Sequence, residues 1–131
     1  MTNKTYKPLL IDSVKATADL PKQRFVSFGG AVCTAGEKAF GISDVETDNG
    51  QFAPVGVLGI FLIETGGAIT RGDAVTSDAD GKAVTATGDT IESTTEDETT
   101  TYSIQKGDAV NGYALDTASS SGEIIRVVRG I

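Results

Sequence analysis

The side chains that could take part in chemistry are one cysteine and eighteen carboxylates, with no histidine beside them. Without histidine there is no Ser-His-Asp or Cys-His nucleophile, no imidazole metal ligand and no histidine general base. Cys33 is alone, so neither an intrachain disulfide nor a thiolate metal cluster can form. Between Val32 and Thr34, it is predicted to be a small buried apolar residue.

Carboxylates in pairs can hydrolyse glycosidic bonds. Nothing in the spacing of the acids marks such a pair, and the chain has no tryptophan on which a sugar ring could stack. Nor does the chain contain a glycine-rich nucleotide-binding motif. We therefore predict that the protein is not an enzyme and that it has no catalytic and no cofactor-binding residues.

The segment Asp78 to Gly81 is similar to the opening of a calcium-binding loop, and Asp89 occupies the twelfth position from Asp78. However, Lys82 stands at a ligand position and Ala83 replaces the glycine of the calcium loop. The pattern therefore favours a hairpin turn, in which Gly81 adopts a positive φ, and predicts no metal site.

The net charge of −7 argues against a nucleic-acid partner, because phosphate binding draws on clustered lysine and arginine. No run approaches the roughly 18 apolar residues of a membrane span, so no membrane partner is expected. A hydrophobic content of 39% supports a packed core, and 131 residues suffice for one such core.

Short runs rich in valine, isoleucine and alanine, separated by turn residues, predict an all-β fold, either a small β-barrel or a β-sandwich. The expected strands are 24–28, 38–43, 55–63, 68–77, 82–86, 100–104, 109–115 and 123–128. The run 55–63 is apolar at nearly every position, which indicates a central strand or a strand with one face in an oligomer interface. The expected structural turn residues are Gly72, Asp73, Gly81, Gly107, Asp108 and Gly122.

The charge is unevenly distributed along the chain. Residues 1–24 carry five basic and two acidic side chains, a net charge of +3, which leaves −10 for residues 25–131. We expect residues 1–24 to form an N-terminal arm and residues 25–131 a β-rich domain. The candidate interface residues are Lys4, Tyr6, Lys7, Leu9, Leu10, Ile11 and Arg24. A disordered tail and an edge strand on the chain's own domain are the alternatives. The acidic segment Thr85 to Thr101 is expected to be a long solvated loop or β-excursion.

Several strand-and-turn motifs resemble those of the capsid cement, or head decoration, proteins of tailed bacteriophages. The motifs are Ala39 to Ser43, Gly56 to Phe61, Gly72 to Val75, Asp78 to Thr85, Gly112 to Asp116 and Ile124 to Val127. The segment 91–102 is longer than the usual connection in that family.

This resemblance implies a non-enzymatic all-β protein that is made in the host cytoplasm and binds the outer surface of an expanded capsid. There it would staple major capsid proteins together, usually as a homotrimer. The alternative is a carbohydrate-binding or adhesin module on a virion fibre or cell surface.

Overall fold

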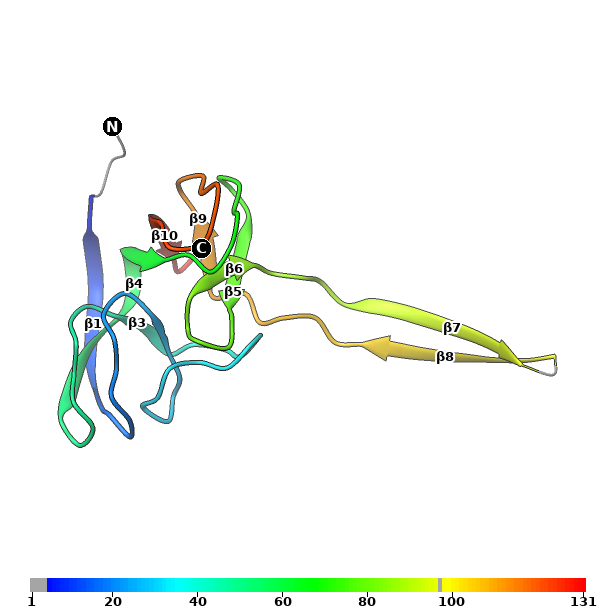
Figure 1. Cartoon of the computed structure of the whole chain (residues 1–131), viewed down its shortest axis with the longest axis horizontal. Helices are drawn as coiled ribbons and strands as arrows, with labels where there is room; N and C mark the ends of the chain where they lie inside the picture. The colour runs from blue at the N-terminus through cyan, green and yellow to red at the C-terminus, as the bar shows by residue number, and fades with distance from the viewer. Residues whose placement is uncertain (1–4, 97) are drawn as a thin grey trace.

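The computed structural model describes residues 5–96 and 98–131, and within them it contains strands and no helix (Figure 1). The all-β prediction is confirmed. The ten strands are β1 (Lys7–Lys15), β2 (Phe25–Val26), β3 (Gly41–Ser43), β4 (Phe52–Glu64), β5 (Ala74–Ser77), β6 (Ala83–Thr85), β7 (Thr90–Glu96), β8 (Thr99–Gln105), β9 (Gly112–Ala114) and β10 (Ile124–Arg129).

Eight of the strands form one curved sheet in the order β2-β3-β4-β10-β9-β5-β6, with β1 paired to β4 beside this path. The sheet is nearly closed into a barrel. A backbone hydrogen bond of 2.7 Å from Phe25 N to Gly81 O joins its two ends, and a parallel bridge links Thr65 to Ala83. Closure removes most of the free edges that an open sheet would present.

Strand β4 is the centre of this sheet, since it is apolar from Phe52 to Ile63 and has partners on both edges. One edge pairs with β1, and the other pairs first with β3 and then with β10. Ala53, Val55, Phe61 and Ile63 are buried at alternating positions. Because successive side chains of a strand point to opposite faces, the residues between them face away from the core.

The core consists of two clusters of buried side chains, and β2 contributes to both. Phe25 lies in the larger cluster with Phe61 and Ile63, whereas Val26 lies in the smaller one. The smaller cluster is completed by Ala16 and Leu20, which are almost fully buried. The chain following β1 therefore packs into the folded body.

β1 and β7 were expected only as alternatives, β1 as an edge strand in place of a free arm and β7 as part of a β-excursion in place of a solvated loop. β1 is an edge strand on the chain's own domain, the alternative noted above, and its neighbouring residues Leu9, Leu10 and Ile11 are all exposed. A strand that is solvated on both faces shows no apolar alternation. β7 is rich in threonine and glutamate, and it pairs with β8 along its whole length.

The β7–β8 hairpin projects far from the barrel, on the side away from β1 (Figure 1). At its base, a backbone bond from Asp108 N to Thr87 O (2.8 Å) joins the two legs, and a bond from Ala109 N to Gly36 O (3.0 Å) fixes them to the body. The acidic segment Thr85 to Thr101 therefore lies in a β-excursion and not in a long irregular loop.

Candidate interaction surfaces

The side chains that could do chemistry are engaged in the fold. Cys33 is fully buried, and burial raises the pKa of its thiol to about 12. A thiol with such a pKa is almost wholly protonated near neutral pH and is a poor nucleophile. Among residues 5–96 and 98–131, no group of three or more acidic or cysteine side chains is placed to hold a metal ion. The same residues include no helix that could cross a membrane.

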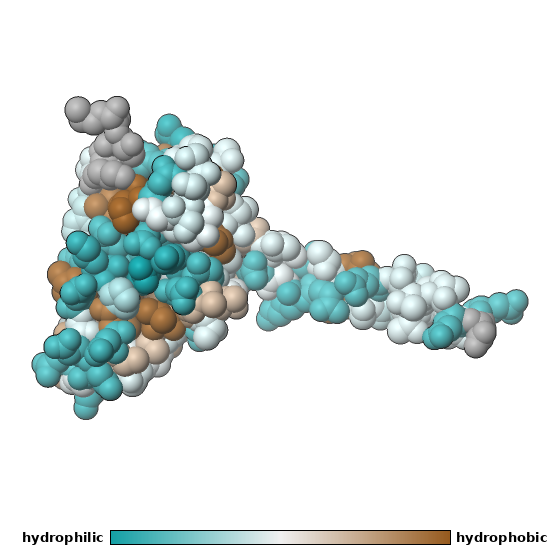
Figure 2. Space-filling model, viewed as in Figure 1, coloured by the Kyte–Doolittle hydropathy of each residue, from teal (hydrophilic) through white to brown (hydrophobic). Residues whose placement is uncertain are grey.

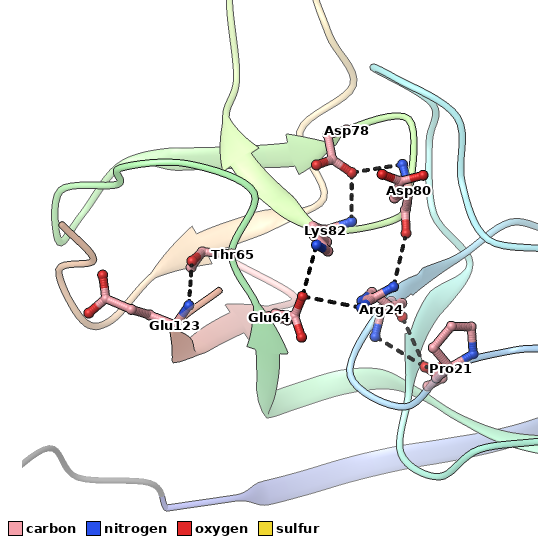
Figure 3. Close-up of polar contacts among 9 residues, drawn as sticks. Pro21, Arg24, Glu64, Thr65, Asp78, Asp80, Lys82 and Glu123 are labelled. Atoms are coloured by element: carbon pink, nitrogen blue, oxygen red, sulfur yellow. Dashed lines mark hydrogen bonds and ion pairs between the residues drawn. The ribbon is translucent and has the colours of Figure 1, made fainter. Parts of the chain in front are cut away.

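Asp78 acts as a turn residue. Its Oδ1 atom accepts hydrogen bonds from the backbone nitrogens of Asp80 (2.8 Å) and Lys82 (2.9 Å), as Figure 3 shows. Gly81 completes the turn with a φ of 77°. The carboxylate therefore satisfies backbone donors within its own hairpin.

The other predicted turn residues take two different forms. Gly72 has a φ of 93°, and Asp73 Oδ2 accepts a hydrogen bond from Thr70 N at 3.0 Å. At position 107 glycine is needed because there is no room for a side chain: a Cβ atom there would lie 2.5 Å from Thr87 O. Gly72 is thus favoured by its backbone conformation and Gly107 by close packing.

Two further predicted turn residues fix other parts of the body. Asp108 Oδ2 accepts a hydrogen bond from Thr87 N at 2.9 Å, at the base of the projecting hairpin. Gly122, with a φ of 89°, lies in the turn before β10 and donates its backbone N–H to Thr65 O at 2.8 Å. Asp108 and Gly122 therefore make structural contacts within the chain at the positions predicted to be turns.

Among the candidate interface residues, Arg24 has partners within the chain. Its Nη2 atom lies 3.2 Å from Glu64 Oε2, and Lys82 Nζ lies 3.1 Å from the same oxygen (Figure 3). The hydrogen bond from Lys82 and the charge of Arg24 lower the pKa of Glu64, against the opposing effect of desolvation. Arg24 thus links β2 to β4 and the β5–β6 hairpin.

Tyr6 lies beside the barrel rather than free in solvent. Its ring meets the edge of the Phe61 ring at a centroid distance of 5.8 Å. Partial burial and the neighbouring Asp44 carboxylate raise the pKa of the Tyr6 hydroxyl. Lys4 lies outside the described residues.

The remaining candidates are gathered on β1. Lys7, Leu9, Leu10 and Ile11 are all exposed, and Leu9 is 85% exposed. The edge of β1 that faces away from β4 has no strand partner in the part of the chain that the structure describes. β1 therefore offers unpaired backbone groups together with uncovered apolar side chains.

An apolar groove of about 380 Å³ lies beside β1, and we call it the β1–β4–β10 groove. It is lined by Lys7, Leu9, Leu58, Gly59, Ile60, Val128, Arg129, Gly130 and Ile131. Next to it, a hollow of about 370 Å³ shares Leu58 and residues 129–131 and adds Lys38. The groove combines apolar walls with basic side chains.

Arg129, one of these cations, is held by backbone carbonyl groups. Its guanidinium donates hydrogen bonds to the carbonyl oxygens of Val57 (2.9 Å), Asn111 (2.7 Å) and Phe40 (3.2 Å). Desolvation lowers its pKa, but no carboxylate pairs with it among residues 5–96 and 98–131. Its positive charge is therefore held in place by neutral dipoles and is not cancelled.

The β7–β8 hairpin presents a surface that the sequence analysis did not identify. Residues opposite each other in the register share a face, so Ile91 and Ile104 lie together, followed by Ser93 and Tyr102. Ile91, Tyr102 and Ile104 are each more than 70% exposed, and Figure 2 shows a hydrophobic patch on the projecting hairpin. In the sequence, this surface could have been recognised from Tyr102 and Ile104, which are two residues apart and so lie on the same face of a strand.

Comparison with known proteins assigns this chain to a family. The model of the phage cement protein family matches residues 6–129. This chain belongs to the phage cement protein family. It is therefore a phage structural protein, as the resemblance of its strand and turn motifs implied.

A solved structure supports the fold assignment. The chain is similar to the N-terminal base of the head fiber protein gp8.5 of bacteriophage phi29, with a TM-score of 0.61 and 21% sequence identity. The similarity covers 92% of this chain and 93% of that one. No curated protein matches the chain.

Proposed function

We propose that this cement-family protein is a non-enzymatic decoration protein that binds the outer surface of a phage head and stabilises contacts between major capsid proteins. The observation that carries the proposal is the family match over residues 6–129. The structure supplies a physical means, since β1 presents exposed apolar side chains and an unpaired edge.

The contact strand in this proposal is β1. Burial of Leu10 and Ile11 against a partner would contribute free energy in proportion to the apolar area removed from water. The free edge of β1 can also add backbone hydrogen bonds to an extended segment of the partner. Several copies held together as a homo-oligomer, with a trimer favoured, would turn modest contacts into firm attachment through avidity.

A charge-insertion variant tests this use of β1. Truncation is unsuitable because β1 covers one edge of β4. We expect Leu10→Lys/Ile11→Lys to weaken binding to expanded capsids about tenfold or more, since losing burial of even one such side chain costs about 1.5–3 kcal/mol. Binding is measured by co-sedimentation with capsids made of the major capsid protein alone.

The matched control is Asn49→Lys/Ser121→Lys, which likewise adds two charges, at exposed turn residues outside the strands. It should bind as the wild type does. Both variants should keep the wild-type circular dichroism spectrum, because the substituted side chains lie outside the core. Undiminished capsid binding by the β1 variant would remove β1 from the contact.

A further inference from the structure

The β7–β8 hairpin is unusually exposed for a regular element. All of its described residues are solvent-exposed, and its only sheet partner is itself. An isolated two-stranded hairpin is at best marginally stable in water. Such an element gains stability when one of its faces is covered.

The hairpin has two chemically distinct faces. One face, which we call the hydrophobic face of the hairpin, carries the register pairs Ile91 with Ile104, Ser93 with Tyr102 and Thr95 with Thr100. The opposite face carries Glu92 and Glu96 opposite Ser103 and Thr99. This division is typical of a sheet with one covered face and one face in water.

The β1–β4–β10 groove has the complementary character. Its walls include Leu9 and Ile131, each 85% exposed, and its basic residues are Lys7 and Arg129. Neither cation forms an ion pair with another described residue. The segment 90–105 has four acidic side chains and no basic one. The hydrophobic face of the hairpin thus matches the apolar walls of the groove, and the net negative charge of segment 90–105 is opposite in sign to Lys7 and Arg129.

The two surfaces are at opposite ends of the molecule. β1 lies on one side of the barrel and the hairpin extends from the other, so they cannot meet within one chain (Figure 1). They can meet between copies, in a head-to-tail contact. Repeated around an axis, a contact of this kind closes a ring.

We propose that the hydrophobic face of the hairpin of one copy packs into the β1–β4–β10 groove of a second copy. Tyr102, Ile91 and Ile104 supply the apolar side chains, while Glu92 and Glu96 stay on the solvated face of the hairpin. The proposal deepens the proposed function, on which it rests, by naming the contact that holds the decoration oligomer together. The oppositely charged surfaces steer the two copies into this orientation.

Site-directed cross-linking of the full chain, without capsids, tests the contact. Ser93→Cys places a thiol on the hydrophobic face of the hairpin, and Val128→Cys places one in the groove. Native Cys33 stays, because it is fully buried. With a short bismaleimide, we expect covalent oligomers from the double variant and from an equimolar mixture of the two single variants.

Each single variant alone should remain uncross-linked. Covalent dimers from Ser93→Cys alone would show that hairpins meet one another, which would overturn the proposal. Absence of cross-links in the double variant would overturn it as well.

Two lysine variants of the hairpin allow a second measurement that does not depend on cross-linking. Tyr102→Lys and Ser103→Lys change the charge equally on neighbouring residues of opposite faces. By light scattering, Tyr102→Lys should raise the dissociation constant of the oligomer about tenfold or more, and Ser103→Lys should change it far less. Equal effects would contradict the proposal. A wild-type protein that binds capsids yet stays monomeric in solution would overturn this contact and leave the proposed function intact.

Discussion

Glu64 shows how a single carboxylate joins separate elements of the barrel. It accepts contacts from both Arg24 and Lys82, and it lies at the end of the central strand. The three side chains are partly buried, so their attraction is less screened than that of a surface pair. Arg24, a candidate interface residue by its charge, thus has an ion-pair partner inside its own chain.

The pKa of Glu64 predicts how stability depends on pH. Because the folded-state pKa is lowered, the ionised carboxylate stabilises the fold above the unfolded value of about 4.3, and this is lost as the pH falls through the folded value. We expect Glu64→Gln to lower the free energy of unfolding by about 1 kcal/mol at pH 7, with the difference vanishing in acid. Urea unfolding at several pH values measures it.

Glu92→Gln is the matched control for this experiment, since it makes the same substitution on the exposed hairpin. It should leave the unfolding free energy nearly unchanged across the same range. A Glu64→Gln deficit that stays constant down to pH 3 would show that the ionised form does not stabilise the fold.

The pairing of β1 with β4 depends on one glycine. Gly59 has a φ of 125°, and a Cβ there would lie 2.5 Å from Lys7 O and 2.7 Å from Leu9 N. Because glycine lacks a side chain, it lets another backbone approach closely. In the structure, the backbone that approaches Gly59 belongs to β1 of the same chain.

Substitution of this glycine should loosen β1. We expect Gly59→Ala to destabilise the fold by about 2–4 kcal/mol, from backbone strain and overpacking together. Gly50→Ala is the control, because Gly50 has a φ of 90° with open space around it and so suffers the strain alone. Thermal unfolding compares the two, and equal losses would mean that β1 does not pack closely at Gly59.

The predictability of each element follows from its burial. β4 was expected because the run 55–63 is apolar at nearly every position, and β10 because Ile125 and Val127 alternate with Arg126 and Val128. β1 showed neither pattern, since its apolar residues Leu9, Leu10 and Ile11 are only three in a row and are exposed. Its location and charge nevertheless marked it as a contact segment, a prediction that still awaits a test.

The shape of the molecule was less accessible to sequence reasoning. Strand patterns do not specify the order of pairing, so barrel and sandwich remained alternatives until contacts such as Phe25 N to Gly81 O were seen. The β1–β4–β10 groove was equally hidden, because its walls come from three strands distant in sequence. Folding alone brings Leu9, Leu58 and Val128 together.

The whole molecule is a barrel with β1 on one side and the β7–β8 hairpin projecting from the other (Figure 1), an arrangement that suits the proposed connecting role. The central claim is that it attaches to the outside of a phage head. The most direct measurement is cryo-electron microscopy of expanded capsids, made of the major capsid protein alone, after incubation with the purified protein. We predict additional density on the outer surface at symmetry-related positions, into which the barrel fits. Capsids that remain bare at saturating protein concentration would contradict the claim.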